Sequence, residues 1–299
     1  MAAEIPPAQD DIEKILKGIT IPSPPQIIAD LQMEMAMPDP DLNEMADMIS
    51  KDPGLAGGVL KILNSPFYGN RDIGSISKAV MMLGMNTVAS IVNTLYLRES
   101  TFQQSDVSDE LYKAMNHFWD SATDVARACQ LVAQRLRFND PDKVYMLGLF
   151  HNAGIPLLMQ RFPDYPEILV QSYLHEDHRI VDTENKLCKT NHAVVSFYAA
   201  RSWKLPELLC RVIAEHHNGI DIFSEADKTN VDEKYLLAML KLGEHLAGLY
   251  QTIGNQSDDI EWQQIKEKTL DYLDLTQFDF EDLLESAADN GIGGQSYFM

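Results

Sequence analysis

Three observations predict an all-α fold. Apolar residues recur every three or four positions through most of the 299-residue chain, which is the period of helices that pack on a core. The alternation of apolar and polar residues that is typical of strands does not extend over any useful length. Residues that commonly start or stop helices, chiefly Asp, Ser, Pro and Gly, lie between the periodic segments.

The first hundred residues are predicted to form short helices joined by turns. Ser23, Asp41 and Asp52 are the expected N-cap residues of three of them, because their side-chain oxygens can accept hydrogen bonds from free backbone N–H groups. Gly84 is the expected C-cap between the last two, and a turn is predicted at residues 64–69. The predicted helices cover residues 12–18, 24–37, 42–50, 54–63, 75–83 and 86–97.

A polar segment at residues 101–109 lacks apolar periodicity and is the predicted linker to a second helical domain. The predicted helices beyond it cover residues 110–136, 145–160, 166–174, 181–203, 207–217, 233–250, 261–273 and 277–288. We therefore divide the chain into four parts. They are an N-terminal helical unit at residues 1–100, the linker, a second helical domain at residues 110–255, and a C-terminal extension with a flexible tail at residues 256–299.

Composition excludes some classes of function. The chain has 24 basic and 45 acidic residues and a formal net charge of −21, which argues against binding to nucleic acid or to an anionic membrane. Its three cysteines, Cys129, Cys188 and Cys210, lie far apart without CxxC spacing, as expected of reduced thiols. The sequence has no signal-peptide pattern, and no apolar run approaches the roughly 20 residues of a membrane span. We predict a cytoplasmic protein.

One pair of polar residues, His151 and Asn152, lies inside the strongly apolar segment 145–160. Burying an imidazole or an amide without hydrogen bonds costs about 1–3 kcal/mol, so this pair must have partners. Two interpretations remain open, a hydrogen-bonded structural network and a ligand site. Asp120 and Asp124 lie four residues apart on one predicted helix, where they could bind a cation or form a solvated acidic face.

The N-terminal part carries a set of residues whose order and spacing resemble the HDOD family of bacterial signalling proteins. The set comprises Ile49, Asp52, Pro53, Leu55, Leu60, Asn64, Ser65, Phe67, Gly69, Ile76, Ala79, Leu83 and Gly84. Segments 203–206 and 213–217 look like later landmarks of the family, so the resemblance covers roughly residues 19–250. It implies an N-terminal helical bundle packed on a C-terminal domain related to the HD phosphohydrolases.

The resemblance also implies positions for a metal site. HD phosphohydrolases bind metal through a histidine, an adjacent His-Asp pair and a later aspartate. In this chain the first histidine position falls on Asp120, the pair on His151 and Asn152, and the last aspartate near Glu244. Two positions depart from the pattern, because Asp120 replaces a histidine and the neutral amide of Asn152 replaces a carboxylate. The implied site is therefore degenerate, and we assign no catalytic residue.

Further histidines of the cyclic-dinucleotide phosphodiesterase branch would correspond to His192, His216 and His217. Together with His151 they could line one cavity and hold Zn²⁺, Ni²⁺ or Fe²⁺. The alternative is structural, since a histidine at a helix C-terminus also stabilises the helix dipole. On balance the sequence favours a site without a metal.

The expected function is that of a non-catalytic regulatory protein in bacterial signal transduction. It would bind partner proteins, and its degenerate pocket would hold a small ligand such as a nucleotide, or none. The alternative is a metal-dependent phosphohydrolase acting on a nucleotide or a cyclic dinucleotide, with the four histidines as ligands and Asp120 or Glu244 as carboxylates. Neither nucleic acid nor a membrane is an expected partner.

Overall fold

The structure is a computed structural model that describes residues 16–64, 73–102, 108–174, 178–223 and 230–293. Within these ranges every regular element is a helix, which confirms the predicted fold class. The helices are α2 Gln26–Met35, α3 Leu42–Ser50, α4 Pro53–Leu63, α5 Ile76–Phe102, α6 Asp109–Arg135, α7 Pro141–Phe150, α8 Gly154–Arg161, α9 Tyr165–Ser172, α10 Ile180–Cys188, α11 His192–Ser202, α12 Glu207–Glu215, α13 Gly219–Ile222, α14 Val231–Leu246, α15 Leu249–Thr252, α16 Ile260–Tyr272 and α17 Gln277–Asp289.

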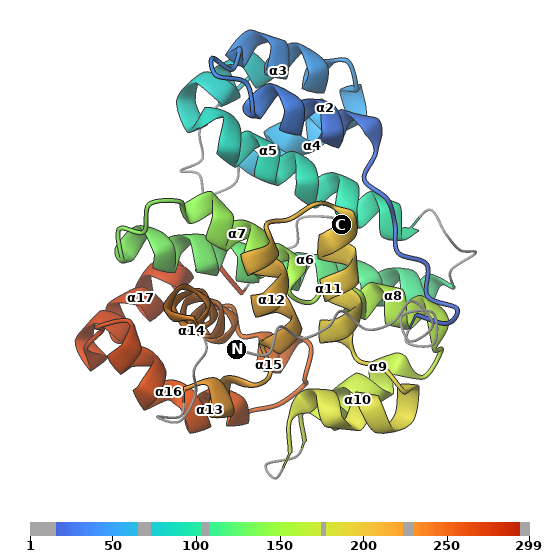
Figure 1. The fold of residues 1–299 in the computed structure, drawn as a ribbon, viewed down its shortest axis with the longest axis vertical. Coiled ribbons are helices and arrows are strands. Elements are labelled where there is room, and N and C mark those ends of the chain that lie inside the picture. Colours follow the sequence, from blue (N-terminus) through green and yellow to red (C-terminus); the bar gives the residue numbers. More distant parts are fainter. Residues whose placement is uncertain (1–15, 65–72, 103–107, 175–177, 224–229, 294–299) are drawn as a thin grey trace.

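Helices α2 to α5 form a bundle at one end of the molecule, drawn from blue to cyan above the remaining helices in Figure 1. The predicted N-caps are present at α3 and α4, where Asp41 accepts a hydrogen bond from the Asn43 N–H and Asp52 accepts one from the Leu55 N–H. Helix α5 packs against α3 and α4 and also reaches α7, so it connects the bundle to the rest of the fold.

Some predicted helix ends in the bundle were wrong. Helix α2 begins after Pro25 rather than at the expected Ser23 cap, because the backbone is still extended at Pro25. The predicted break at Gly84 is confirmed, because α5 consists of two helical parts on either side of a kink with a non-helical backbone at Gly84 (φ 83°, ψ 163°). That conformation suits glycine. The predicted helix start at residues 12–15, the turn at 65–69 and the linker residues 103–107 lie outside the described residues.

Two long helices predicted in the second half are each broken in the structure. The segment 145–160 divides into α7 and α8, with a turn at residues 151–153. The segment 181–203 divides into α10 and α11, where Lys189 has a left-handed backbone (φ 61°) and Asn191 caps α11. Pro156 accounts for part of the first break, since its missing N–H is tolerated best in the first turn of a new helix.

Helix α6 runs through the centre of the second half and is buried along most of its length. It packs against α7 and α14, and two glycines permit the close approach. A Cβ atom at Gly148 of α7 would lie 2.9 Å from the Cys129 sulfur, and one at Gly243 of α14 would lie 2.5 Å from it. The cysteines at 129, 188 and 210 are all unpaired, as predicted.

Helices α16 and α17 belong to the predicted C-terminal extension. Both pack on α14, and α17 also contacts α6, so the extension covers the second helical domain. In Figure 1 these helices and α14 lie side by side in the orange and red part of the chain. Their position is important for the site, because α16 supplies one of its carboxylates.

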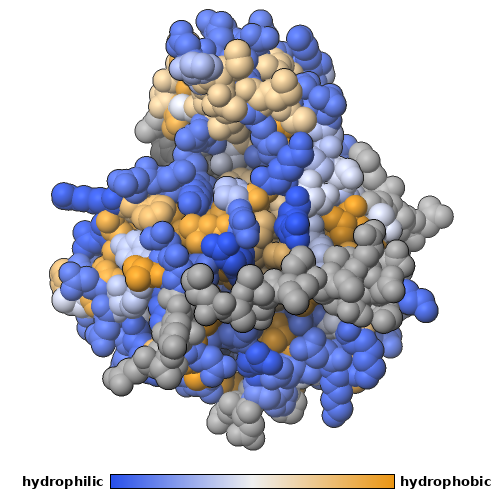
Figure 2. Space-filling model, viewed as in Figure 1, coloured by the Kyte–Doolittle hydropathy of each residue, from blue (hydrophilic) through white to orange (hydrophobic). Residues whose placement is uncertain are grey.

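Helix α5 is long and apolar enough to cross a membrane when judged by length and composition. We did not predict a segment of this kind from the sequence. Core helices of water-soluble proteins pass the same test, and α5 packs against α3, α4 and α7 here. The bundle exposes several methionines, namely Met33 and Met37 in and after α2, and Met81 and Met82 in α5 itself. Figure 2 shows a moderately hydrophobic surface over this end of the molecule.

Candidate functional site

Four histidines from three helix ends meet in the interior of the second half. His151 follows the last residue of α7, His192 is the first residue of α11, and His216 and His217 follow α12. Neighbouring rings have centroids 4.1 to 5.4 Å apart. The first three side chains are fully buried and His217 is 6% exposed. The structure thus brings together all four histidines suggested from the sequence.

The break between α7 and α8 places His151 beside the start of α11. The Gly154 N–H donates a hydrogen bond to the Ser196 hydroxyl over 2.8 Å, and a Cβ atom at position 154 would collide with the His192 carbonyl. Only a glycine fits this close contact. The turn that carries His151 and Asn152 is therefore fixed against the helix that carries His192.

Each imidazole places its Nδ1 atom on an acceptor that has no proton to donate. The pairs are His151 with the Gly148 carbonyl at 2.6 Å, His216 with the Ile213 carbonyl at 2.7 Å, His192 with Glu184 at 2.6 Å and His217 with Glu261 at 3.0 Å. We therefore assign the proton of each neutral ring to Nδ1, which leaves a lone pair on Nε2. Such partners also orient histidines that bind metals.

The Nε2 lone pairs face other acceptors. His192 Nε2 lies 2.9 Å from His217 Nε2. His151 Nε2 lies 3.1 Å from Glu244 Oε1, although the angles there are not those of a hydrogen bond and both atoms lack a hydrogen-bond partner among the described residues. His216 Nε2 also lacks one. Buried acceptors at these distances repel one another unless a proton or a cation lies between them.

A proton is a poor bridge at two of these rings. Burial lowers the pKa of His216 well below its ordinary value, and the neighbouring His217 and Lys241 lower it further. Burial, together with Lys241 and His192, likewise holds the pKa of His217 far below the usual range. Both rings are therefore neutral near pH 7, and a metal cation suits their lone pairs better than a proton does.

The donor atoms form two overlapping sets that fit a divalent transition metal. One contains His192, His216 and His217, and the other contains His151, His216 and Glu244. In each set the ligand atoms lie within 4.8 Å of one another. Imidazole nitrogens with one carboxylate oxygen are a usual donor set for Zn²⁺ and are also suited to Ni²⁺ and Fe²⁺.

A buried lysine supplies a positive charge beside two carboxylates of the site. Lys241 Nζ donates hydrogen bonds to Glu244 Oε2 over 2.8 Å and to Glu261 Oε2 over 3.0 Å. Burial alone would lower the pKa of Lys241, but the two carboxylates raise it above its ordinary value. Burial would raise the pKa of Glu244, whereas Lys241 and His151 hold it well below the usual value. The lysine and the carboxylate are therefore both charged at pH 7.

Three residues of the site, Glu184, Lys241 and Glu261, were missed in the sequence. Glu184 was an ordinary acidic residue in a predicted helix, and Glu261 lay in the extension outside the predicted second domain. Lys241 carried a weak signal, since it precedes Glu244 by three residues on one helix, a spacing at which side chains meet. No spacing rule relates the two glutamates to the histidines, because tertiary packing alone brings them together.

Asp120 and Asp124 have partners outside the histidine cluster. Asp124 Oδ2 accepts a hydrogen bond from the Gly293 N–H over 2.8 Å, and Asp124 Oδ1 lies 3.4 Å from Arg127 Nη1. Asp120 interacts electrostatically with Asp124 and with Arg98 of α5. Asp120 is not a member of either set of donor atoms around the histidines, so the ligand position assigned to it from the sequence stays a prediction.

Asn152 is buried next to His151, and neither its amide oxygen nor its amide nitrogen has a hydrogen-bond partner among the described residues. The hydrogen-bonded core pair that we considered for His151 and Asn152 is thus not formed. The amide oxygen could act as a weak neutral ligand of a bound cation, but it supplies no negative charge.

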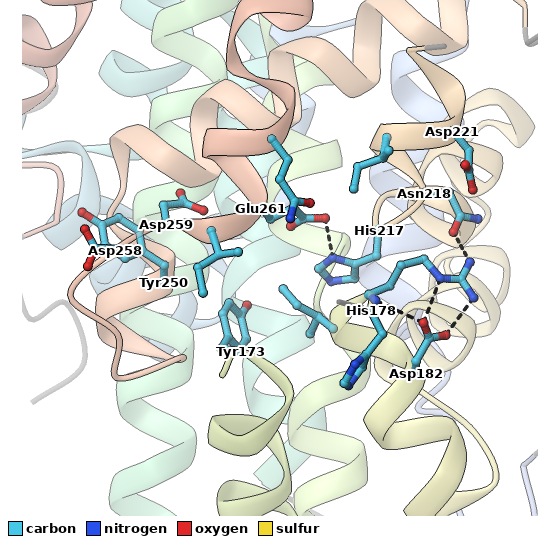
Figure 3. A pocket seen from close by; sticks show the side chains of 15 residues that line it. Tyr173, His178, Asp182, His217, Asn218, Asp221, Tyr250, Asp258, Asp259 and Glu261 are labelled. Atoms are coloured by element: carbon cyan, nitrogen blue, oxygen red, sulfur yellow. Dashed lines mark hydrogen bonds and ion pairs between the residues drawn. The ribbon is translucent and has the colours of Figure 1, made fainter. Parts of the chain in front are cut away.

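A cleft of about 500 Å³ opens beside the histidines. His217 and Glu261 lie in the middle of its lining residues in Figure 3, between Tyr173 on one side and Asn218 on the other. Arg179 lies at the same cleft, where Asp182 and Asn218 accept hydrogen bonds from its guanidinium group. The cleft therefore connects one edge of the histidine cluster to the surface.

Comparison with known families identifies the fold. A model of the HDOD domain matches residues 21–219, which is about two thirds of the chain. The chain belongs to the HDOD family. An uncharacterized protein from Treponema pallidum (strain Nichols) is 26% identical over 204 residues. The match covers 66% of this chain and only 38% of that relative, so the chain spans well under half of its length.

Two solved structures resemble this HDOD chain over nearly its whole length. An HDOD domain protein of unknown function from Geobacter sulfurreducens has 23% identity and a TM-score of 0.69, with 96% of this chain and 97% of that chain covered. A protein from Shewanella amazonensis SB2B, named as a candidate phosphohydrolase, has 22% identity and a TM-score of 0.65, with 94% and 95% covered. At such identities the likeness shows the fold alone.

Proposed function

We propose that this HDOD chain is a signal-transduction protein that holds a divalent transition metal in its histidine site and uses the site for binding rather than for hydrolysis. The observation that carries the proposal is the arrangement of the four imidazoles, in which each Nδ1 lies on a hydrogen-bond acceptor, so that the ring proton is assigned to Nδ1 and the lone pair to Nε2. A site that only stabilised the core would need donors opposite these nitrogens. Our sequence-based preference for a site without a metal is thereby reversed.

The residues that would hold the metal are His151, His192, His216, His217 and Glu244. A bound Zn²⁺, Ni²⁺ or Fe²⁺ ion would supply positive charge to the buried lone pairs and would link the ends of α7, α11 and α12 to α14. Glu184 and Glu261 orient two of the rings through their Nδ1 protons. Metal binding would therefore stabilise the folded arrangement of these helices.

Two features favour binding over turnover. The carboxylate of the HD pair is replaced by Asn152, so one anionic ligand and one group able to manage a proton are missing. The remaining carboxylate, Glu244, has one oxygen occupied by Lys241. The partners that we propose are proteins of a bacterial signalling pathway, in the cytoplasm, where unpaired cysteines are usual. The methionine-rich surface of the bundle supports a protein partner, because flexible methionines adapt to apolar surfaces.

The proposal is tested by metal analysis of protein purified without chelator. We expect stoichiometric Zn²⁺, Ni²⁺ or Fe²⁺ by inductively coupled plasma mass spectrometry, and a lower melting temperature after the metal is removed. The same protein dialysed against Zn²⁺ should regain the bound metal and the original melting temperature. Protein that contains no metal, takes up none from added Zn²⁺ and melts at an unchanged temperature would refute the proposal.

A metal-dependent phosphohydrolase is the second candidate, and the cleft at His217 favours it. The cleft is large enough for a nucleotide, and Arg179 at its edge suits a phosphate. The Shewanella protein named as a candidate phosphohydrolase has the same fold. Hydrolysis of a cyclic dinucleotide by the wild type, lost in His216→Ala, would establish this candidate. Activity that appears only in Asn152→Asp would indicate a decayed enzyme whose geometry survives.

A further inference from the structure

The two donor sets of the site share one residue. His216 belongs to both, and its Nδ1 proton is already donated to the Ile213 carbonyl. The ring therefore offers a single lone pair, on Nε2, and one lone pair binds one ion. Two ions cannot both have a full set of three protein ligands in this arrangement. The number of metal ions that the site holds therefore depends on the groups that lie beside the second donor set, which contains His151, His216 and Glu244.

Lys241 lies beside this second donor set, because it contacts Glu244. Its Nζ atom contacts one oxygen of Glu244 and one oxygen of Glu261, while the other oxygens of the same carboxylates contact His151 and His217. The ammonium group therefore lies between two carboxylates, one of which contacts His151 and the other His217. Two carboxylate oxygens beside imidazole nitrogens are the surroundings in which a bridging divalent ion would be expected. Here a side-chain cation takes that place.

The charge of the site agrees with this arrangement. The charged groups that contact the four imidazoles and Lys241 are the carboxylates of Glu184, Glu244 and Glu261. When the imidazoles bind a metal as neutral rings, three carboxylates and the lysine leave a net charge of two negatives, which one divalent cation neutralises. A second divalent cation would leave two uncompensated positive charges in a buried site, an arrangement that is strongly unfavourable.

We propose that the centre is mononuclear and that the Lys241 ammonium is a built-in cation that excludes a second metal ion. The inference rests on the proposed function, since it presupposes that one ion binds. It follows that removal of the lysine charge frees the Oε2 atoms of Glu244 and Glu261. These oxygens, together with His151, are the groups that we expect to hold a second ion, while His216 remains available to the first.

The test is the number of Zn²⁺ ions bound per chain after saturation and gel filtration, in the wild type and in Lys241→Met. We expect one ion in the wild type and two in the variant. Lys241→Arg keeps the charge and should stay at one ion. His216→Ala is measured in the same way. Its bound Zn²⁺ gives the number of ions held by the acidic surface, and this number is subtracted from the values of the other proteins. Circular dichroism checks that each variant is folded. If Lys241→Met does not fold, Lys241→Gln is used in its place, because its amide retains a hydrogen-bond donor for the carboxylates.

The outcomes separate the inference from the proposed function. A wild type that binds no ion would overturn both. A wild type that binds two ions, or an uncharged variant that still binds one, would overturn the role of Lys241 and leave the metal site standing. Electron paramagnetic resonance of the Mn²⁺ form gives an independent result from the wild type alone. Uncoupled Mn²⁺ signals support a mononuclear centre, whereas a spin-coupled pair contradicts it.

Discussion

The chain buries two polar clusters that the sequence offered as candidate cation sites, and they are built in different ways. In the cluster on α6, Asp124 accepts a hydrogen bond from the Gly293 N–H and Arg127 donates one to the Asn290 carbonyl over 2.8 Å. Donors there meet acceptors, and the segment 290–293 after α17 is fixed to α6. In the histidine cluster, once each ring proton is assigned to Nδ1, acceptors face acceptors, as His192 Nε2 and His217 Nε2 do over 2.9 Å.

The difference separates a structural network from a ligand site. Both clusters are buried and both contain ionisable groups, so burial and composition do not distinguish them. The distinguishing property is whether the atoms of the cluster can satisfy one another, which depends on the side of each imidazole that carries the proton. Substitutions in the α6 cluster should therefore change stability without changing metal content, and those in the histidine cluster should change both.

The largest effect is expected for Arg127→Met. At pH 8 the substitution leaves the buried Asp124 carboxylate without its cation and the Asn290 carbonyl without its donor. Breaking a buried ion pair on one side costs about 3–5 kcal/mol, and we expect a loss of that size in the free energy of unfolding by urea. The bound metal should be unchanged. Arg135→Met is the matched control on the same helix, because its ion pairs with Asp279 and Asp282 are exposed and should contribute at most about 1 kcal/mol.

The next effect is expected for His216→Ala, which removes the ligand common to both donor sets. Metal binding should be lost, together with the stabilisation that metal provides. That stabilisation is about 2.7 kcal/mol when free metal is a hundredfold above its dissociation constant. Thermal unfolding with and without Zn²⁺ measures it. His117→Ala is the control, because His117 is an exposed residue of α6 that contacts the Thr252 carbonyl. Equal Zn²⁺ stabilisation in both variants would mean that the ion binds elsewhere.

A smaller effect is expected for Glu184→Gln. Glu184 accepts hydrogen bonds from both the ring and the backbone N–H of His192, so the substitution weakens the group that orients this ligand. Loss of such a partner typically reduces metal affinity by about 10- to 100-fold, and competition with a chelating dye would measure the change. Glu167→Gln, an exposed carboxylate on α9, should leave the affinity as it is. An unchanged affinity in Glu184→Gln would remove His192 from the ligand set.

The last effect concerns pH and is given per pH unit. Burial raises the pKa of Asp124 to about 7, despite the opposing influence of Arg127 and the Gly293 N–H. In the unfolded chain this group titrates near 3.9, so between about pH 4 and pH 7 the folded state holds a proton that the unfolded state has released. The free energy of unfolding should therefore fall as pH rises through this window, by up to about 1.4 kcal/mol per pH unit. Asp124→Asn should remove that contribution, and an identical pH profile for the variant and the wild type would contradict it.

Local signals in the sequence were sufficient for the fold class, the family and several helix starts. Asp41 and Asp52 cap helices because the capping interaction lies within three residues of chain. The break after His151 was not predictable in the same way, since apolar residues continue on both sides of it and the contact that fixes it, between Gly154 and α11, is forty residues away in sequence.

For the site, the family resemblance indicated the four histidines and Glu244, and the structure brings these residues together. It gave no indication of Glu184, Lys241 or Glu261, whose role depends on helices that meet only in the folded protein. It also assigned a ligand position to Asp120, which is in neither donor set and interacts with Arg98. The proton positions on the imidazoles follow from their Nδ1 partners, and two of those partners are the glutamates that the sequence did not reveal.

The most direct test of the metal site is X-ray absorption spectroscopy of the Zn²⁺-loaded protein at the zinc edge. Our account predicts a first shell of nitrogen and oxygen atoms at about 2.0–2.1 Å, with the outer-shell scattering of several imidazoles. A shell of oxygen atoms without imidazole scattering would place the zinc on the acidic surface. That result would contradict the account and would leave the four histidines as a core network.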